Sequence, residues 1–269
     1  MYLQGRIDRI EQAKYADTTY LRVIDFKSGK QGLDFSEIYY GLKIQLLTYL
    51  NVALRYYANL LPDEQQLMPA GVLYYFLKSG IVSTDGPMNA NEAEALHQNK
   101  LRADGLLLAD MHALKLAERD LDTGASTLLP LSLLTKAAPY IEDPDSFDTL
   151  EDPMELFGKR NRTVVSREQM QWLLDHTVQI IAAMGEEIHK GNIAIRPCRI
   201  RQFTGCKYCD YQAICQIQTI DFEKNCEELI PLKPEELWQR LSEETKKQGT
   251  KQRGGADNAA MDKRTTAGH

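Results

Sequence analysis

The sequence lacks the long apolar runs and the N-terminal pattern that mark membrane-spanning or exported chains. None of its apolar runs approaches the ~18 residues needed to cross a bilayer. The N-terminus has no charged segment followed by an apolar one, which argues against export. We therefore expect a globular cytoplasmic protein without a membrane partner, whose 269 residues allow one large domain with a sizeable core.

The sequence also lacks clustered histidines and a net positive charge. The histidines stand singly, without metal-ligand spacing or a nearby nucleophilic partner, so we assign none of them a role. The net charge of −6 would repel DNA if it were evenly spread, and DNA binding therefore requires local Lys/Arg clusters. One such cluster runs from Lys190 to Lys207 without an acidic residue, although a solvated surface fits it equally well.

The most informative stretch is an apolar strand predicted at residues 20–29. Side chains alternate along a strand, so Asp25 and Lys27 project from the same side at its C-terminal end. Asp8 belongs to an earlier short strand, and the polar run after it can return the chain as an antiparallel neighbour. That pairing would bring Asp8 and Asp25 together, with Lys27 beside them.

Two carboxylates and a lysine at one sheet edge suit metal-assisted phosphodiester cleavage. Mg²⁺ typically takes one or two carboxylates together with water and substrate phosphate. The metal polarises the scissile phosphate and lowers the pKa of a bound water, while a lysine can orient that water or stabilise phosphoryl charge. The alternative is that Asp25 and Lys27 are merely solvated residues, because Asp-x-Lys tripeptides are common.

A long helix is predicted from residue 34 to about residue 60. It opens with a capping box in which Asp34 is the N-cap and Glu37 reaches back. One face of this helix would carry the residues that recur at three- and four-residue steps, namely Ile38, Leu42, Gln45 and Tyr49. The last two either belong to the core or point at the carboxylates, where an amide and a phenol can hold phosphate, water or a lysine.

Three segments in this order resemble the nuclease motifs of the RecB-like branch of the PD-(D/E)xK superfamily. They read GRIDRI at 5–10, IDFKSG at 24–29 and GLKIQLLTYL at 41–50. The likeness runs from about residue 2 to 241 and is of the AddB/RexB type, the B subunits of helicase-nucleases. It implies an α/β fold with a restriction-endonuclease-like core, in which helices flank a mixed sheet. It also implies a helical insertion and a C-terminal cysteine-cluster segment.

The resemblance also implies residue boundaries and roles. The nuclease domain would span 1–242, and a disordered tail would follow at 243–269. The domain would comprise a core at 1–78, an insertion at 79–165, a closing helix at 166–190 and an iron–sulfur segment at 198–226. The implied metal ligands are Asp8, Asp25 and the backbone carbonyl of Phe26. Lys27 would support the chemistry, and Gln45 and Tyr49 would complete the catalytic site.

The start of the chain departs from the family pattern. Relatives carry a helix with a further acidic or histidine ligand ahead of the first motif, and a large helicase-like region before that. Met1 stands only seven residues before Asp8. We therefore expect this chain to be the C-terminal part of a longer protein.

Cysteine spacing supplies a second constellation. Cys206, Cys209 and Cys215 follow the pattern Cys-x₂-Cys-x₅-Cys, which in a cytosolic protein is more typical of metal binding than of disulfides. Zinc, an iron–sulfur cluster and an ordinary thiol cluster all stay open on spacing alone. The resemblance implies three ligands of a [4Fe–4S] cluster whose fourth cysteine lies upstream, outside this chain. Cys198 and Cys226 match no ligand position of the family.

The function implied by the resemblance is that of a Mg²⁺-dependent DNA exonuclease domain. Such a domain pairs with an AddA-type helicase-nuclease subunit and cleaves the 5′-terminated single strand during double-strand-break repair by recombination. The alternatives are a CRISPR-adaptation-type iron–sulfur exonuclease and a catalytically incomplete fragment that binds DNA ends. The long segment between residues 77 and 165 favours the AddB type. The intact Asp8, Asp25 and Lys27 favour a nuclease over a binding module.

Overall fold

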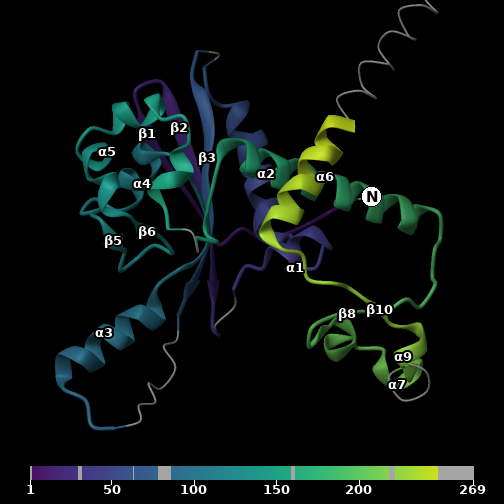
Figure 1. The fold of residues 1–269 in the computed structure, drawn as a ribbon. Coiled ribbons are helices and arrows are strands. Elements are labelled where there is room, and N and C mark those ends of the chain that lie inside the picture. Colours follow the sequence, from purple (N-terminus) through teal and green to yellow (C-terminus); the bar gives the residue numbers. More distant parts are fainter. Residues whose placement is uncertain are drawn as a thin grey trace, which may run out of the picture. The chain divides into compact units, whose positions relative to one another are not determined.

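A computed structural model gives the fold of residues 2–29, 32–62, 64–77, 86–158, 161–217 and 222–247 (Figure 1). The chain divides into two compact units, which we describe separately. The sheet unit comprises residues 2–33 and 43–174, and the cysteine unit comprises residues 34–42 and those from 175 onward. Among the residues that the structure describes, no helix is both long and apolar enough to cross a membrane.

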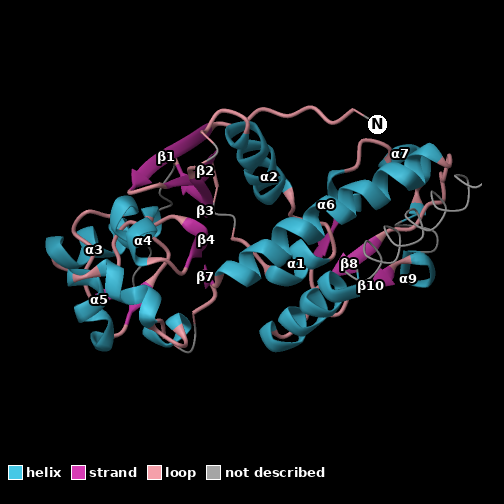
Figure 2. Ribbon diagram, turned by 90° about the horizontal axis from the view of Figure 1, so that it is seen from above, coloured by secondary structure: helices cyan, strands magenta, loops and turns pink. Residues whose placement is uncertain are grey.

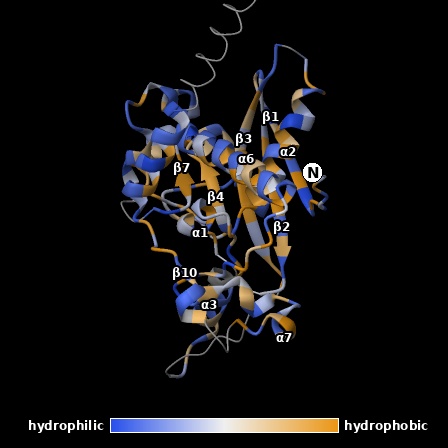
Figure 3. Cartoon of the chain, turned by 90° about the vertical axis from the view of Figure 1, so that its right-hand side faces the viewer, coloured by the Kyte–Doolittle hydropathy of each residue, from blue (hydrophilic) through white to orange (hydrophobic). Residues whose placement is uncertain are grey.

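The sheet unit is built on a five-stranded mixed sheet in the order β1-β2-β3-β4-β7 (Figure 2). Its strands are β1 (Arg9–Tyr15), β2 (Thr18–Lys27), β3 (Gln66–Phe76), β4 (Asp104–Leu108) and β7 (Val164–Val165). The pairs β1–β2 and β3–β4 are antiparallel, whereas β2–β3 and β4–β7 are parallel. Strands β3, β4 and β7 are largely hydrophobic, as strands covered on both faces require (Figure 3).

Helices cover both faces of this sheet (Figure 1). Helix α2 (Gln45–Ala58) packs on one face through Leu46, Leu47, Leu50 and Ala53, all buried. On the other face, Ile24 belongs to a hydrophobic cluster with residues of α4 (Met111–Ala117) and α5 (Ala138–Glu142). Because successive strand residues point to opposite faces, Asp25 lies on the face that α2 covers.

Residues 79–165, expected to form a helical insertion, also supply two strands of the sheet. Strand β4 pairs with β3, and β7 pairs with β4. The physical reason is burial, since the apolar run at residues 106–108 is almost completely excluded from solvent and pairs as a strand in the sheet interior. The remaining described elements here are α3 (Ala90–Leu101), β5 (Gly124–Ala125), β6 (Ser132–Leu133) and the 3-10 helices η1 (Thr135–Ala137), η2 (Pro144–Thr149) and η3 (Pro153–Leu156).

The prediction of a single helix from residue 34 to about 60 is wrong. The chain forms two helices there, α1 (Phe35–Tyr39) and α2. Gly41 has a left-handed φ of 76° and ends α1. The amide of Gly41 donates to the Ile38 carbonyl, and that of Leu42 donates to the Glu37 carbonyl, which together form a Schellman motif. Ile38 and Leu42 therefore do not share a helix face with Gln45 and Tyr49.

The cysteine unit contains a three-stranded sheet in the order β10-β8-β9. Helix α6 (Arg167–His189) begins in the sheet unit and ends in the cysteine unit, and it opens with a capping box in which Ser166 and Gln169 hydrogen-bond each other reciprocally. The other elements are β8 (Cys198–Ile200), β9 (Phe203–Thr204), η4 (Gly205–Tyr208), α7 (Gln212–Cys215), α9 (Phe222–Asn225), β10 (Glu227–Glu228) and a helix at 234–247.

Part of the segment predicted to be a disordered tail, residues 243–269, is helical. Residues 243–247 still belong to the helix at 234–247, where Leu237 and Leu241 are buried. Residues 248–269 lie outside the described parts of the chain. The division into a 1–242 domain, with its core, insertion and closing helix, stays a prediction.

Asp34 caps α1 as the sequence indicates. Its Oδ1 accepts the amides of Ser36 at 2.9 Å and Glu37 at 3.1 Å, and its Oδ2 accepts a hydrogen bond from Arg201 at 2.7 Å. Burial acts to raise the pKa of Asp34, but Arg201 and the two amides outweigh it and hold the pKa below its ordinary value of 3.8. A depressed carboxylate pKa adds stability that is present above pH 3.8 and is lost as the pH falls through the folded-state pKa.

We expect Asp34→Ala to lower the free energy of unfolding by about 1 kcal/mol at pH 7, because the capping oxygen is lost. Asp34→Asn keeps that acceptor and loses only the ion pair with Arg201, so its loss should be smaller. Urea unfolding at pH 7 and pH 3 measures both effects. The difference between wild type and Asp34→Asn should shrink at pH 3, and a difference independent of pH would contradict this account.

Candidate active site

Asp8 and Asp25 lie opposite each other at the open end of the β1–β2 hairpin. Arg9 pairs with Ile24 in the antiparallel register, so the next step of the ladder sets Asp8 against Asp25. Asp8 precedes β1, and its Oδ2 accepts a hydrogen bond from the Phe26 amide at 3.0 Å. The predicted antiparallel return of the chain is therefore confirmed.

Lys27 lies beside Asp25, as strand alternation predicts. The Lys27 Nζ is 2.6 Å from Asp25 Oδ2, and Asp25 is only 5% exposed. This contact has the length of an ion pair but not the direction of a hydrogen bond, so Asp25 Oδ2 stays without a hydrogen-bond partner among the described residues. A buried carboxylate oxygen in that state is costly unless a cation completes its environment.

Gln45 and Tyr49 form a pair on the first turns of α2. The Gln45 Nε2 donates to the Tyr49 hydroxyl at 3.1 Å. A Cβ placed on Gly5 would stand 3.0 Å from the Tyr49 ring, so this ring packs on the segment just before Asp8. Within the described chain, neither side chain hydrogen-bonds to Asp8 or Asp25.

The connection between β2 and β3 explains why Gln45 and Tyr49 still belong to this edge of the sheet. Strands β2 and β3 are parallel, and α2 crosses between them. A crossover helix runs antiparallel to the strands it joins, so its first turn lies at the C-terminal ends of those strands. The start of α2 and the end of β2 therefore meet at one edge.

The donor set fits a hard divalent cation such as Mg²⁺. Two carboxylates come together, and one has a buried oxygen without a hydrogen-bond partner. The Phe26 amide faces Asp8, and its carbonyl points to the same side because N–H and C=O of one strand residue are directed alike. Across the described residues, no three His, Cys, Asp or Glu side chains gather to hold a metal. Mg²⁺ does not require three, since water and phosphate complete its coordination.

Sequence reasoning missed Tyr74, which lies on β3 directly opposite Asp25. The Lys27 Nζ stands 5.5 Å from the centroid of the Tyr74 ring, and Tyr74 is only 2% exposed. Asp104 on β4 pairs with Tyr74 and extends this row across the sheet. The sequence carries no spacing signal for either residue, because their placement depends on the registers of β3 and β4.

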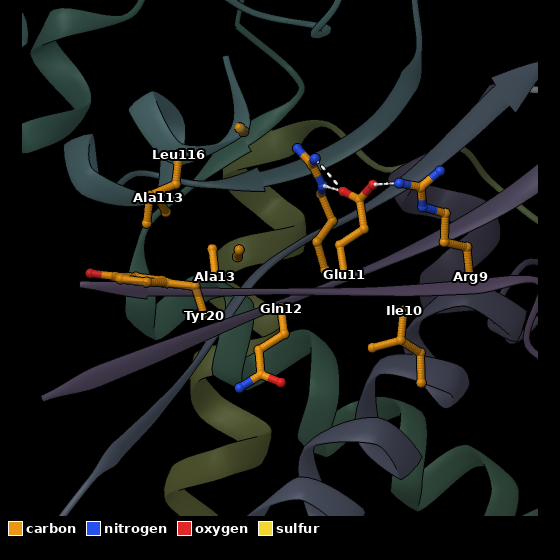
Figure 4. A pocket seen from close by; sticks show the side chains of 11 residues that line it. Arg9, Ile10, Glu11, Gln12, Ala13, Tyr20, Ala113 and Leu116 are labelled. Carbon is orange, nitrogen blue, oxygen red and sulfur yellow. Dashed lines mark hydrogen bonds and ion pairs between the residues drawn. The ribbon is translucent and has the colours of Figure 1, made fainter. Parts of the chain in front are cut away.

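A pocket of about 440 Å³ opens on the opposite face of β2 from Asp25, between β1 and α4 (Figure 4). Glu11 lies between two arginines there, with Arg9 at 2.9 Å and Arg22 Nε at 2.9 Å. Tyr20 donates its hydroxyl to Asp110, and burial raises the pKa of Tyr20. The charges of this pocket are largely neutralised among themselves, and we assign it no role in catalysis.

Cys206, Cys209 and Cys215 line one hollow of about 600 Å³ in the cysteine unit. The five cysteines all lie in described parts of the chain, and none of them forms a disulfide there. These three thiols do not converge on a point where a single ion would sit, within the part of the chain that the structure describes. Cys198 lies nearby on β8, and burial, Glu227 and Cys206 raise the pKa of its thiol.

The basic stretch from Lys190 to Lys207 is partly neutralised. Arg199 pairs with Glu228 at 2.8 Å, and Arg201 pairs with Asp34 at 2.7 Å. Surface ion pairs of this kind reduce the local positive potential that DNA binding requires. The hypothesis that this stretch is a free basic surface is therefore weaker than the sequence indicates.

The mixed α/β fold and the hairpin that brings Asp8 and Asp25 together are features of a nuclease. Residues 1–216 match the sequence profile of the PD-(D/E)XK nuclease superfamily, and the chain belongs to that superfamily.

Among characterised proteins, the chain is similar to several that are named as the B subunit of an ATP-dependent helicase/deoxyribonuclease. It is 31% identical to the protein of Acetivibrio thermocellus over 244 residues, 30% identical to that of Oceanobacillus iheyensis over 253 and 33% identical to that of Clostridium tetani over 244. These alignments cover 91%, 93% and 91% of this chain. They cover 19%, 20% and 19% of the relatives, so the chain spans about a fifth of their length.

Proposed function

We propose that this chain is a Mg²⁺-dependent deoxyribonuclease domain that hydrolyses phosphodiester bonds of single-stranded DNA. Asp8, Asp25 and the Phe26 carbonyl are the proposed metal ligands. The observation that carries the proposal is the hairpin register, which sets Asp8 against Asp25 and leaves a buried carboxylate oxygen without a hydrogen-bond partner among the described residues. Membership of a nuclease superfamily supports the same reaction class.

The chemistry assigned to the chain is in-line hydrolysis. The water loses a proton as its oxygen attacks phosphorus, the bond from phosphorus to the leaving sugar oxygen breaks, and that oxygen takes up the proton. A Mg²⁺ held by Asp8, Asp25 and the Phe26 carbonyl would supply positive charge that polarises the phosphate. Lys27 forms an ion pair with Asp25 and has three N–H donors that can serve the water or a phosphoryl oxygen. Gln45 and Tyr49 supply an amide and a phenol at the same edge, where they position the strand.

The biological setting is part of the proposal. The relatives are named as B subunits of helicase/deoxyribonucleases, which supports a helicase-nuclease complex over a CRISPR-adaptation exonuclease. Within such a complex, residues 1–242 act as the nuclease domain next to an AddA-type helicase-nuclease. The domain cleaves the 5′-terminated strand during double-strand-break repair by recombination, in the cytoplasm.

A second proposed role concerns the cysteine unit. Cys206, Cys209 and Cys215 hold a [4Fe–4S] cluster that stabilises this unit and supports binding of DNA ends. The single hollow that these three thiols line favours this proposal. Cluster thiolates contribute nothing to phosphodiester hydrolysis, so this role is separable from cleavage.

The test is cleavage of end-labelled single-stranded DNA in Mg²⁺ and in EDTA. Wild-type chain should cleave only with Mg²⁺, and Lys27→Met should lower the rate about 100-fold, as loss of one charge-stabilising donor does in other enzymes. This variant keeps the aliphatic stem and removes the ammonium. An inactive wild-type chain that still binds DNA ends would favour the binding role, and equal activity of both proteins would reject the assignment of Lys27.

A further inference from the structure

We propose that Tyr74 is a positioning residue that holds the Lys27 ammonium over the catalytic edge. This inference rests on the proposed function and adds a residue to it. Tyr74 lies on β3, directly across the parallel register from Asp25, so its side chain points to the same face of the sheet. The ring centroid is 5.5 Å from Lys27 Nζ, within the range of a cation–π contact.

The ring suits this role because it is buried. Tyr74 is 2% exposed and is among the largest fully buried side chains of the protein. Lys27, in contrast, ends a flexible four-carbon stem, and its side chain is 27% exposed. A buried aromatic face beside a partly exposed ammonium restricts the positions that this ammonium can take.

The type of contact matters as well. An ammonium has three N–H donors, and its Nζ forms an ion pair with Asp25 Oδ2 at 2.6 Å. The π face attracts the whole cation electrostatically without supplying an acceptor atom of its own. The remaining donors therefore stay available for water and phosphoryl oxygens. A second carboxylate in place of Tyr74 would instead engage another donor and neutralise the charge.

A double-mutant cycle tests the proposal. Tyr74→Leu should lower kcat roughly 10-fold with little change in KM, because a desolvated cation–π contact is worth about one decade of rate. The same change made in Lys27→Met should have little further effect. Tyr74→Phe keeps the aromatic face and should retain most of the activity. Tyr75→Leu is the matched control, since Tyr75 follows on the same strand and points to the opposite face.

The outcomes separate this proposal from the proposed function. If Tyr74→Leu lowers kcat by the same factor in the wild-type protein and in Lys27→Met, the ring acts through the fold and not through Lys27, and the proposal is wrong. If Lys27→Met cleaves as fast as wild type, the catalytic assignment of Lys27 in the proposed function is wrong, and the role of Tyr74 is rejected with it.

A second readout does not need activity. The Lys27 ε-methylene protons should show an upfield ring-current shift by NMR, which persists in Tyr74→Phe and disappears in Tyr74→Leu. The same shift in all three proteins would show that the ring does not face the ammonium, and would overturn the proposal.

Discussion

Replacing Asp25 with alanine is expected to lower Mg²⁺-dependent cleavage about 1,000-fold or more, since loss of a metal ligand removes several kcal/mol of transition-state stabilisation. Asp25 supplies a buried carboxylate to the proposed metal site and contacts Lys27. One substitution therefore removes a ligand and also releases the ammonium. Initial rates on labelled single-stranded DNA over a range of Mg²⁺ concentrations measure the effect.

Asp8→Asn is the sharper companion variant. Its amide oxygen can still accept the Phe26 N–H that Asp8 Oδ2 now accepts at 3.0 Å, so the hairpin should keep its geometry. Only the negative charge is lost. We expect cleavage to fall at least about 100-fold, with a higher Mg²⁺ requirement and an unchanged unfolding midpoint. Asp17→Ala, in the exposed turn at the other end of the same hairpin, should cleave like wild type. Normal cleavage by Asp8→Asn would remove Asp8 from the metal site.

Replacing Cys206 with serine is expected to abolish the proposed iron–sulfur cluster. Protein purified or reconstituted without oxygen should contain about four irons and four sulfides in the wild type and less than about one of each in Cys206→Ser. The visible absorbance of the cluster should fall in parallel. Since three thiols line one hollow, losing one leaves the cluster without adequate ligation on this unit.

Cys198→Ser and Cys226→Ser are the controls for that experiment. Both thiols belong to the cysteine unit, and neither lines the hollow. Each variant should keep wild-type iron content. Loss of the cluster in Cys198→Ser would instead make Cys198 the fourth ligand in this chain. Zinc in place of iron in the wild-type protein would reject the iron–sulfur assignment while leaving the three ligands in place.

Local pattern was sufficient to predict the hairpin and the Asp25–Lys27 pair. Strand alternation is a property of the backbone, so the two side chains had to share one face. The polar run after Asp8 could return the chain as an antiparallel neighbour, and the structure shows that it does. The caps at Asp34 and Ser166 were equally predictable, because each depends on residues at most three positions away.

The prediction of one long helix from residue 34 to about 60 was wrong because it relied on the apolar periodicity and ignored Gly41, which signals the end of a helix. Gly41 is the residue type that ends helices in a left-handed conformation, and it could have been read as such. Strand β3 begins at Gln66 and therefore includes Pro69. Pro69 argues against strand structure, but it lies next to an irregularity in the β2–β3 register, where a proline is tolerated.

The contact of Tyr74 with Lys27 could not be predicted by such rules. It depends on the register of two parallel strands joined through a helix, and a shift of one residue would turn Tyr74 to the other face. The strands at residues 104–108 and 164–165 were missed for a related reason. Their partners are distant in sequence, so only tertiary pairing identifies them.

The hairpin has a consequence for the order in which the site forms during folding. Asp8 and Phe26 are 18 residues apart, and a tight turn at residues 16–17 joins their strands. Hairpins of this kind close in about 1–10 μs, whereas parallel pairing through a crossover must wait for a much longer loop to close. The two carboxylates should therefore meet before β3 arrives beneath Lys27. Like charges brought together early oppose that closure, so Mg²⁺ is expected to speed the folding of this chain as well as its catalysis.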